Sequence, residues 1–515
     1  MALPPSRFDF LSDVPRSADL GAVHFIAIGG AGMSGVARVL LGQGLVVSGS
    51  DAKGSPVLRA LESEGARVHV GHDPAHVSGA DTVVISSAIR DDNPELVAAR
   101  AAGLPVLHRA QALAAAMADQ QRVAVAGANG KTTTTSMLTV ALQRCGLDPS
   151  FALGGELTKR ATNAHVGCDD VFVVEADESD SSFLVYRPHV AVVTSIQPDH
   201  LDFYGSFATV EEAYRAFVRT MPDDGLLIVC VDDPGARRLA DWARSEPVRV
   251  LTYGTSADAD LVVGAVEQSG MGAAAALTAG QARHRLTLEV PGVYNLLNAS
   301  AAFAAAVYGL GQLAEDVLAG LASYSGTRRR FEVKGAARGV RVVDDYAHNP
   351  GKVSAVVGTG TALVAGTGRL VVVFQPHLYS RTRDFAAELG SGLAPADVVV
   401  VMDVYAARED PLPGVSGRLV ADAVRTARPA CDVVFVPSWT AVAPLVAGLV
   451  RAGDLVLTVG AGDVTMVGPE VLRLVGADDP AASGAPPGSS HPEEPGEPAE
   501  PGEPHEPGEP EEGSS

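Results

Sequence analysis

Short apolar runs alternate with amphipathic helical stretches through most of the 515-residue chain, and this alternation restricts the fold more than any other feature. The runs VHFIAIGG at 23–30, LVVSGSD at 45–51 and DTVVISSAI at 81–89 are rich in Val and Ile, and helix-like segments separate them. Apolar strands that alternate with helices are typical of a parallel sheet covered on both faces. The sequence therefore predicts an α/β protein.

The strand–helix alternation restarts at about residue 121 and again after Arg330, which indicates three α/β units. A chain of this length can hold two to four domains. We predict domain boundaries at 1–112, 113–327 and 328–475. Ligands of open α/β sheets bind beyond the carboxyl ends of the strands, so candidate functional residues are sought there.

The last 40 residues differ in composition from the rest of the chain. From Gly476 onward the sequence is Pro, Glu and Gly with a rough PGEP repeat, and it holds 11 of the acidic residues that give a formal net charge of −22. We predict that residues 476–515 form a disordered acidic tail without a catalytic role, and no feature indicates a partner for it. The acidic balance of the remaining chain argues against a nucleic-acid partner.

Nothing in the sequence indicates a membrane-spanning segment or a disulfide framework. There is no basic flank followed by an apolar leader, and no run of about 18 uncharged apolar residues. The separations of Cys145, Cys168, Cys230 and Cys431 fit neither a zinc site nor a small disulfide scaffold. We expect a cytoplasmic protein without a membrane partner, whose thiols are buried and reduced.

A glycine-rich turn follows the first strand. Gly30-x-Gly32-x-x-Gly35 opens a helix, and Asp51 ends the second strand 21 residues after Gly30. Such glycines let the backbone approach a diphosphate at a helix N-terminus, and the acid can reach a ribose hydroxyl. The pattern fits NAD or a UDP-sugar equally well, and a structural turn without ligand is the alternative. An oxidoreductase would leave the later motifs without a role.

A second glycine-rich loop follows the strand that opens the central unit. It is the segment from Gly127 to Thr133, GANGKTT, which resembles a Walker A loop except that Val125 stands where the first glycine belongs. In such loops backbone N–H groups surround phosphate, the lysine balances phosphate charge and the hydroxyl after it can ligate Mg²⁺. Lys131 and Thr132 therefore predict an ATP site with Mg²⁺.

Acidic and basic residues end the neighbouring strands. EADESD begins at Glu175, and QPDHLD contains His200, so that both could complete a Mg²⁺ site beside the loop, although solvated turns and a structural histidine are the alternatives. RRR at 328–330 could pair with phosphate or with acids of another domain. DDYAHNP and QPHLYSR, which begin at Asp344 and Gln375, could contact a ribose and a carboxylate or phosphate.

The ordered set of these motifs resembles the UDP-N-acetylmuramate–L-alanine ligases of the Mur ligase family. It comprises GGAGMSG, GxxGKTTT, EADESD, PDHLDFYG, NLLNA, SGTRRRFE, DDYAHNP, FQPHLYSR and DVYAAREDP, and it covers about residues 20–473. GGAGMSG with FQPHLYSR favours the alanine-adding member. The recycling ligase, which attaches a ready-made peptide to the same sugar nucleotide, is the alternative inside the family.

The resemblance implies a three-domain Mur ligase architecture: a Rossmann-like UDP-binding domain, a P-loop ATPase-like central domain and a Rossmann-like C-terminal domain. It also implies an ATP-dependent enzyme of peptidoglycan precursor synthesis that joins L-alanine to UDP-N-acetylmuramate. In that reaction ATP converts the lactyl carboxylate of the sugar into an acyl phosphate, which the alanine amine then attacks. Catalysis is mostly positioning and charge neutralisation.

Residue roles carry over from the resemblance position by position. The UDP-sugar would contact Gly30, Ala31, Gly32, Met33, Ser34, Gly35, Asp51 and Ser87. The nucleotide would contact Gly127, Ala128, Asn129, Gly130, Lys131, Thr132 and Thr133, with Asn298 at the adenine and Asp345 at the ribose. Mg²⁺ would be held by Thr132, Glu175 and His200. Tyr346, His377 and Arg381 would surround alanine or the acyl intermediate. The catalytic set would be Lys131, Glu175, His200, Arg330 and His348.

The chain departs from the usual family motifs at six positions, namely Ala128, Asn129, Ser195, Gln197, Tyr294 and Asn349. Gln197 keeps the shape of the usual Glu without its charge, and Asn129 replaces a histidine that could be cationic. Two alternatives to an active alanine ligase therefore stay open. One is a diverged ligase with an altered substrate or a lowered rate, and the other is a non-catalytic UDP-sugar-binding paralogue.

Overall fold

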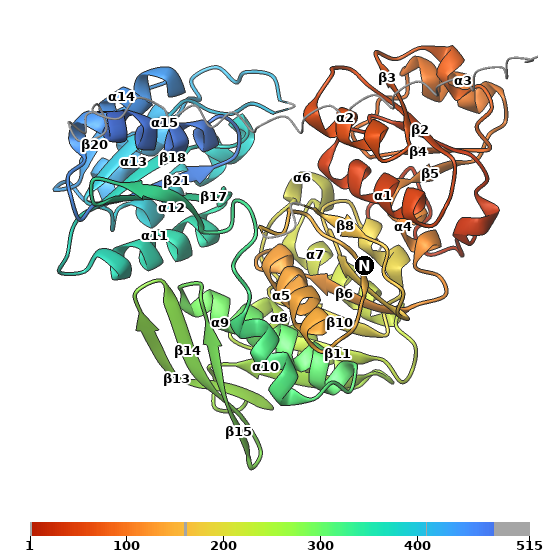
Figure 1. Cartoon of the computed structure of the whole chain (residues 1–515), viewed down its shortest axis with the longest axis horizontal. Helices are drawn as coiled ribbons and strands as arrows, with labels where there is room; N and C mark the ends of the chain where they lie inside the picture. The colour runs from red at the N-terminus through yellow and green to blue at the C-terminus, as the bar shows by residue number, and fades with distance from the viewer. Residues whose placement is uncertain (1–2, 159–161, 408, 478–515) are drawn as a thin grey trace, which may run out of the picture.

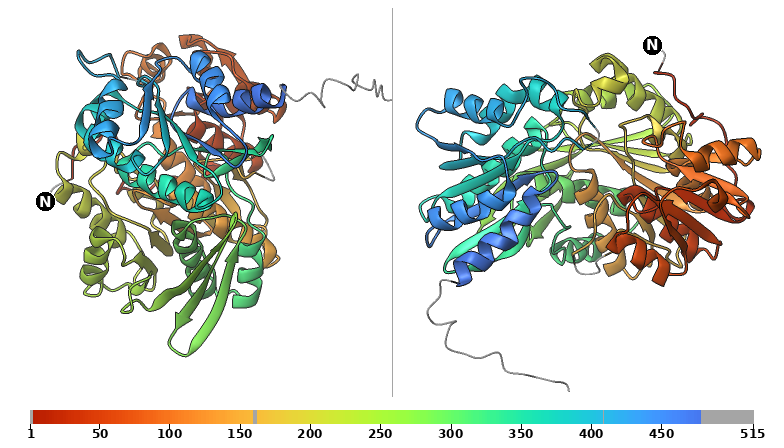
Figure 2. Two further views of the ribbon diagram at one scale, coloured as in Figure 1. Left: turned by 90° about the vertical axis from the view of Figure 1, so that its left-hand side faces the viewer. Right: turned by 90° about the horizontal axis from the view of Figure 1, so that it is seen from above.

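The computed structural model describes residues 3–158, 162–407 and 409–477. Three β-sheets with flanking helices follow one another along the chain. The N-terminal and C-terminal sheets lie on either side of the central one, as Figure 1 and the right-hand view of Figure 2 show. No helix in these described stretches combines the length and apolar character that a membrane crossing requires.

The N-terminal sheet has five parallel strands in the order β3-β2-β1-β4-β5. Its central strands consist of buried residues, because helices cover both faces. Its elements are η1 (Ser17–Asp19), β1 (Val23–Ile26), α1 (Ala31–Gly42), β2 (Val47–Asp51), α2 (Pro56–Ser63), β3 (Arg67–Val70), η2 (Pro74–Val77), β4 (Thr82–Ile85), α3 (Pro94–Ala101), β5 (Val106–His108) and α4 (Arg109–Ala116).

The central sheet has ten strands in the order β15-β14-β13-β12-β11-β10-β6-β9-β7-β8. The parallel strands carry the loops of the site, and the buried helix α5 packs against α9 and α10. The elements are β6 (Gln121–Ala126), α5 (Lys131–Arg144), β7 (Ser150–Ala152), β8 (Ala164–His165), β9 (Val171–Glu175), η3 (Ser182–Tyr186), β10 (Val190–Val193), α6 (Leu201–Tyr204), α7 (Phe207–Arg219), β11 (Leu226–Cys230), α8 (Pro234–Ala243), β12 (Arg249–Gly254), β13 (Leu261–Ser269), β14 (Gly272–Ala279), β15 (Ala282–Leu288), α9 (Val293–Ala304), the π-helical turn η4 (Ala305–Gly309) and α10 (Ala314–Ala322).

The antiparallel strands β13 to β15 extend the central sheet, and the alternation of strands and helices did not predict them. Gly270 and Gly280 have φ values of +54° and +58° in the two connecting turns. Glycine adopts this left-handed conformation without a Cβ penalty, so the chain can reverse within two or three residues. The hairpins therefore depend on turn residues rather than on hydrophobic periodicity.

The C-terminal sheet has the order β16-β17-β21-β18-β19-β20, with only β16 antiparallel to its neighbour. Two apolar clusters lie on its two faces. The elements are β16 (Glu332–Ala337), β17 (Val340–Asp345), α11 (Pro350–Val364), β18 (Leu370–Gln375), α12 (Tyr379–Leu393), β19 (Val398–Val401), α13 (Arg418–Ala427), β20 (Asp432–Phe435), α14 (Trp439–Leu449), β21 (Leu455–Gly460) and α15 (Val464–Ala477).

Two expectations need correction. Helix α15 continues through Ala477, two residues into the segment predicted as the acidic tail, because Val475 still packs against the C-terminal sheet. The remainder of that tail, 478–515, lies outside the described residues. All four thiols are free, but Cys168 is exposed in the turn before β9 and Cys145 is half-buried, so burial holds only for Cys230 and Cys431.

Candidate functional site

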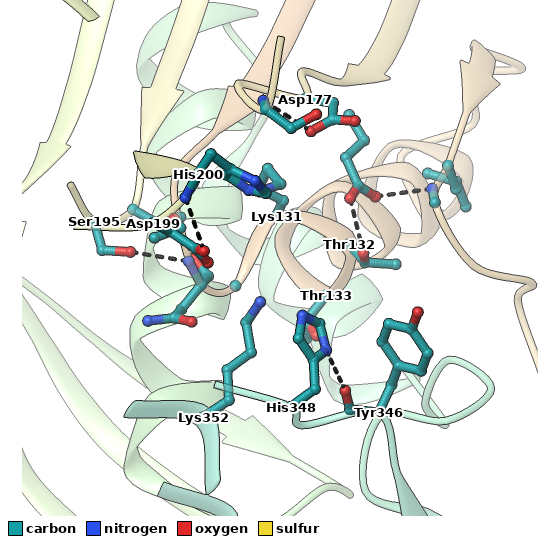
Figure 3. A pocket seen from close by; sticks show the side chains of 18 of the residues that line it. Lys131, Thr132, Thr133, Asp177, Ser195, Asp199, His200, Tyr346, His348 and Lys352 are labelled. Carbon is teal, nitrogen blue, oxygen red and sulfur yellow. Dashed lines mark hydrogen bonds between the residues drawn. The ribbon is translucent and has the colours of Figure 1, made fainter. Parts of the chain in front are cut away.

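A cavity of about 1320 Å³ lies where the three domains meet. Figure 3 shows side chains of the central and C-terminal domains converging on it. It is reached by the carboxyl ends of strands from all three sheets, as expected for α/β folds. Of the residues to which the resemblance assigned a role, the cavity is lined by Gly30, Gly32, Met33, Gly35, Ser87, Ala128, Asn129, Gly130, Lys131, Thr132, Thr133, Glu175, His200, Asn298, Arg330, Asp345, Tyr346 and His348.

The first glycine-rich turn forms the N-terminal wall of the cavity. Gly30 is the N-cap of α1, and Ala31 is the first residue of that helix. Ser34 is buried behind the wall, and the carboxylate of Asp51 accepts a hydrogen bond of 3.0 Å from the Gly29 N–H. Asp51 thus holds the turn, and neither it nor Ser34 belongs to the cavity lining.

The P-loop requires glycine at two positions with positive φ. Gly127 has a φ of +135°, and a Cβ there would lie 2.1 Å from Thr194 Oγ1. Gly130 has a φ of +87° and caps α5, and a Cβ there would lie 2.4 Å from Asn298 Oδ1. The loop therefore packs directly on the end of β10 and on α9. This packing directs the first N–H groups of α5 toward the cavity, where an anion can bind.

Alanine substitutions at the two ends of α5 form a matched pair. Gly130 and Gly146 have φ values of +87° and +88°, but no atom lies within 4 Å of a Cβ at Gly146. We expect Gly146→Ala to lower the free energy of unfolding by about 1 kcal/mol through the left-handed backbone alone. Gly130→Ala should cost about 1–3 kcal/mol more by displacing Asn298, and should weaken ADP binding. Urea unfolding and nucleotide titration measure both effects; equal losses would contradict the close packing of the loop.

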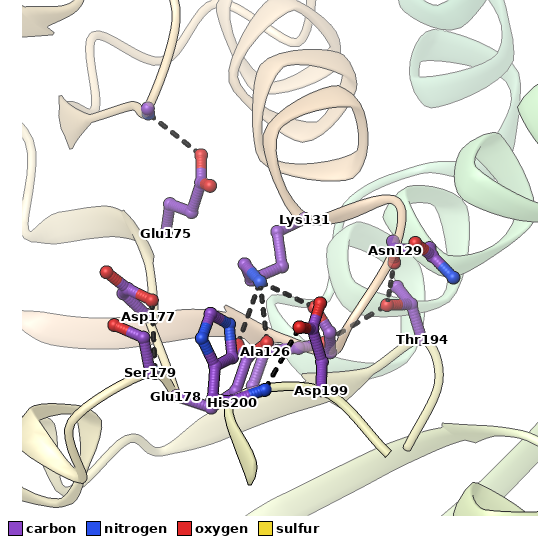
Figure 4. Close-up of polar contacts among 12 residues, drawn as sticks. Ala126, Asn129, Lys131, Glu175, Asp177, Glu178, Ser179, Thr194, Asp199 and His200 are labelled. Atoms are coloured by element: carbon purple, nitrogen blue, oxygen red, sulfur yellow. Dashed lines mark hydrogen bonds and ion pairs between the residues drawn. The ribbon is translucent and has the colours of Figure 1, made fainter. Parts of the chain in front are cut away.

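Lys131 is held by a buried ion pair. Its Nζ donates to both carboxylate oxygens of Glu178, at 2.9 and 2.8 Å, and to the Gly127 carbonyl at 2.7 Å (Figure 4). Burial by itself would lower the pKa of Lys131, but Glu178, Asp177 and Glu175 together raise it above its ordinary value. The side chain is therefore cationic at neutral pH and is oriented at the phosphate-binding loop.

Thr132 joins the acidic strand end to the C-terminal domain. Its hydroxyl donates to Glu175 Oε1 at 3.0 Å and accepts from Arg330 Nη2 at 3.1 Å. The second oxygen of Glu175 accepts from the Gly154 N–H at 2.8 Å. Arg330, which follows the end of the central domain, thus reaches the P-loop directly. Its guanidinium also lies 5.4 Å from the ring centre of Tyr346.

The donor set fits Mg²⁺ bound together with a nucleotide. The Thr132 hydroxyl and the Glu175 carboxylate are adjacent hard oxygen ligands, which suit a cation that takes its other ligands from phosphate and water. Within the described part of the chain, no group of three or more His, Cys, Asp or Glu side chains is arranged to hold a metal alone. His200 lies elsewhere in the site, between Asp177 and Asp199, with a φ of +55° (Figure 4).

Four of the six departures form one hydrogen-bonded group. The Asn129 N–H donates to Ser195 Oγ at 3.0 Å, and its side-chain amide donates to Gln197 Oε1 at 2.9 Å. The Asn349 amide donates to Asn129 Oδ1 at 3.3 Å and so joins the C-terminal domain to the P-loop. These neutral groups satisfy one another. Of the other two, Ala128 is buried, and Tyr294 lies on α9 and lines the cavity.

The residues assigned to the ribose and to alanine lie at the C-terminal wall. Both oxygens of Asp345 accept backbone N–H groups, from Phe331 at 2.7 Å and from Ala347 at 2.8 Å. Burial raises the pKa of Asp345 to about 6, and Arg330 and these hydrogen bonds oppose the rise. The carboxylate therefore organises the loop after β17 as well as lining the cavity.

The imidazoles and Arg381 lie side by side at the same wall. His348 Nδ1 lies 2.8 Å from the Tyr346 carbonyl, and its ring centre lies 5.4 Å from that of His377. Burial, Lys352 and Arg381 lower the pKa of His348 well below its usual value. Arg381 is ion-paired with Asp199 at 3.0 Å. His377 and Arg381 are not among the residues that line the cavity.

Sequence reasoning missed several residues in and around the cavity. Arg109 begins α4 and pairs with Asp177 at 3.0 Å, which joins the N-terminal and central domains. It has no motif around it. Glu178 was part of the acidic segment, but nothing in the sequence distinguished it from its neighbours as the partner of Lys131. Lys352 follows DDYAHNP by two residues, and only the tertiary structure directs it into the cavity.

The fold and this site define a three-domain α/β protein of the P-loop class. Three domain families match it in order: Mur ligase family, catalytic domain over 22–121, Mur ligase middle domain over 125–306, and Mur ligase, glutamate ligase domain over 329–462. The chain belongs to the Mur ligase family. The α/β class and the three-domain architecture that the resemblance implied are therefore confirmed.

Several individual relatives are named as UDP-N-acetylmuramate–L-alanine ligases. A UDP-N-acetylmuramate–L-alanine ligase of Kineococcus radiotolerans is 56% identical over 461 residues, which cover 89% of this chain and 97% of the relative. One of Saccharopolyspora erythraea is 53% identical over 472 residues, with coverage of 90% and 95%. The crystal structure of UDP-N-acetylmuramate-alanine ligase from Thermotoga maritima has a TM-score of 0.74 at 28% identity, and the match covers 88% and 98% of the chains.

Proposed function

We propose that this chain is an ADP-forming ligase that joins L-alanine to UDP-N-acetylmuramate in the synthesis of peptidoglycan precursors. The observation that carries the proposal is the convergence of two glycine-rich turns, one from the N-terminal domain and one at Lys131, on a single cavity closed by the C-terminal domain. A sugar linked to a diphosphate and a nucleoside triphosphate can therefore bind next to each other in this cavity. An oxidoreductase would need neither the P-loop nor the third domain.

The three domains divide the substrates among them, with boundaries at 1–112, 113–327 and 328–475. The glycine turn from Gly30 to Gly35, including Ala31, holds the UDP, supported by Asp51 and Ser87. The P-loop and Asn298 hold ATP, with Asp345 near the ribose. Tyr346, His377 and Arg381 surround alanine. The reaction takes place in the cytoplasm, without a membrane or nucleic-acid partner.

The chain's own groups supply orientation and charge for two successive transfers. The sugar carboxylate attacks the γ-phosphorus, the bridging P–O bond breaks and ADP leaves; the amine then attacks the acyl carbon and phosphate leaves. Lys131 and Arg330 neutralise the charge on the transferred phosphoryl group. His348, whose low pKa keeps it neutral, accepts the proton that the amine loses. Thr132 and Glu175, together with His200, would hold Mg²⁺, which would supply positive charge to the phosphate groups.

The mutual satisfaction of Asn129, Ser195, Gln197 and Asn349 favours an active enzyme over a non-catalytic paralogue. A site that had lost its function would have no reason to keep this group complete around an intact Lys131, Thr132 and Glu175. Because the four side chains are neutral, the charge of the site comes from Lys131, from Glu175 and from the other ionised residues that line the cavity.

The proposal predicts phosphate release from Mg-ATP that requires both UDP-N-acetylmuramate and L-alanine. A Lys131→Ala variant should release none above background, and glycine or L-serine in place of alanine tests the specificity. The recycling alternative would instead respond to a ready-made peptide. Release without the sugar nucleotide, or no release while the sugar nucleotide still binds, would contradict the ligase and favour the binding paralogue.

A further inference from the structure

Lys352 is a basic side chain of the cavity that the mechanism above does not use. It lies in the first turn of α11 and points from the C-terminal domain toward Lys131 (Figure 3). Within the described part of the chain, its ammonium makes no hydrogen bond or ion pair. Its backbone N–H donates to Asn349 Oδ1 at 2.9 Å.

The surroundings of Lys352 disfavour its positive charge. Burial and the nearby cations Lys131 and Arg330 lower its pKa to about 8, and Asp199 and Glu178 oppose this only in part. A cation in the first turn of a helix also opposes the helix dipole. The ammonium is nevertheless the major form at neutral pH, so the cavity holds positive charge that the described residues do not neutralise. A charge kept at such a position indicates a ligand of the opposite sign.

The N-terminus of α11 lies directly against the P-loop. Asn349 caps this helix and donates to Asn129 Oδ1 at 3.3 Å. A Cβ at Gly351 would lie 3.4 Å from Gln197 Oε1 and 3.6 Å from Asn129 Nδ2. Lys352 is the next residue, and its charge acts on Lys131, which the loop directs at phosphate. Lys131, Arg330 and Lys352 therefore approach the same region from two domains.

We propose that the Lys352 ammonium binds the terminal phosphoryl group of the nucleotide, so that the C-terminal domain contributes a cation that distinguishes ATP from ADP. This inference rests on the proposed function only in placing a nucleotide at the P-loop. The contact forms when the C-terminal domain sits against the loop, as it does here through Asn349 and Arg330. Loss of the γ-phosphate removes the partner of Lys352, which favours release of ADP.

The test compares the affinities of the full-length protein for the β,γ-imido analogue of ATP and for ADP, both with Mg²⁺, by calorimetry. Lys352→Met should weaken binding of the analogue about 10- to 100-fold, because one charge-assisted contact is lost, and should change ADP binding less than about threefold. Lys352→Arg should recover most of the difference, because it keeps the charge. Lys334→Met, which removes a lysine of the same domain paired with Glu332, should alter neither affinity.

Equal weakening of both nucleotides, or no weakening of the analogue, would overturn the proposal. Thermal unfolding without ligand provides a second readout: the Met variant should melt at the same or a higher temperature, because an unneutralised charge is removed, and a markedly lower value would mean that Lys352 is structural. The binding test needs neither sugar nor alanine. A further outcome is that Lys352→Met weakens binding of the ATP analogue selectively while phosphate release requires substrates other than UDP-N-acetylmuramate and L-alanine. In that case the proposed function is wrong, and the contact between Lys352 and the terminal phosphoryl group is still supported.

Discussion

Replacing Lys131 by alanine is expected to lower ATP-dependent phosphate release by at least about 10³-fold and to destabilise the protein at the same time. The loss of rate follows because Lys131 is the cation that the P-loop directs at the transferred phosphoryl group. The loss of stability follows from Glu178, whose side chain is only 4% exposed and would be left without its 2.8 Å partner. A buried charge that loses its partner costs about 3–5 kcal/mol.

A double variant separates the two effects. Lys131→Met with Glu178→Gln removes both charges, so it should recover most of the free energy of unfolding while phosphate release stays abolished. Urea unfolding and a phosphate-release assay on the single and double variants measure this. If the single variant is as stable as the wild type, the ion pair is not the buried interaction that its geometry indicates.

The second large effect, on the free energy of unfolding, is expected on substitution of Glu95, which lies outside the cavity. This carboxylate is completely buried at the start of α3 and lies 2.7 Å from His76 Nδ1 and 3.2 Å from His72 Nδ1. It also accepts from Ser50, and His24 Nε2 lies 3.7 Å away. Burial alone would raise the pKa of Glu95, but the neighbouring His24 ring and hydrogen bonds from Ser50 and His76 lower it to about 2. The Glu95 carboxylate is therefore ionised in the folded protein, and several donors hold it there.

The lowered pKa of Glu95 determines how its contribution to the free energy of unfolding changes with pH. Glu95 stabilises the folded state fully above its unfolded pKa of about 4.5, by about 3 kcal/mol, and this contribution is lost as the pH falls from there toward 2. Glu95→Gln should therefore lower the free energy of unfolding by about 3 kcal/mol at pH 7, and the difference from wild type should shrink below pH 4.5.

Denaturant unfolding at pH 7, 4 and 3 tests this, with Glu62→Gln as the control. Glu62 is an exposed carboxylate on α2 of the same domain, and its substitution should change stability by less than about 0.5 kcal/mol. A Glu95 variant that loses no stability at pH 7, or whose deficit does not change on acidification, would show that the carboxylate is not held as an anion by its donors.

Local sequence patterns predicted most of the framework. The Val-rich runs became the buried parallel strands, and the glycine turns at Gly30 and Gly130 open α1 and α5, because strand periodicity and helix caps depend on residues close together in sequence. The antiparallel strands β13 to β15 were missed. The alanine-rich strand β14 holds a single β-branched residue, Thr278, and sheet pairing rather than propensity makes it a strand.

The sequence by itself determined the three α/β units, the family and the motif residues that can bind phosphate, because each of these depends on short patterns or on similarity along the chain. Only the tertiary structure decided which side chains meet. It paired Lys131 with Glu178, closed Asn129, Gln197 and Asn349 into one group and directed Lys352 into the cavity. These partners lie on different strands, helices and domains, and only packing of the folded chain sets the distances between them.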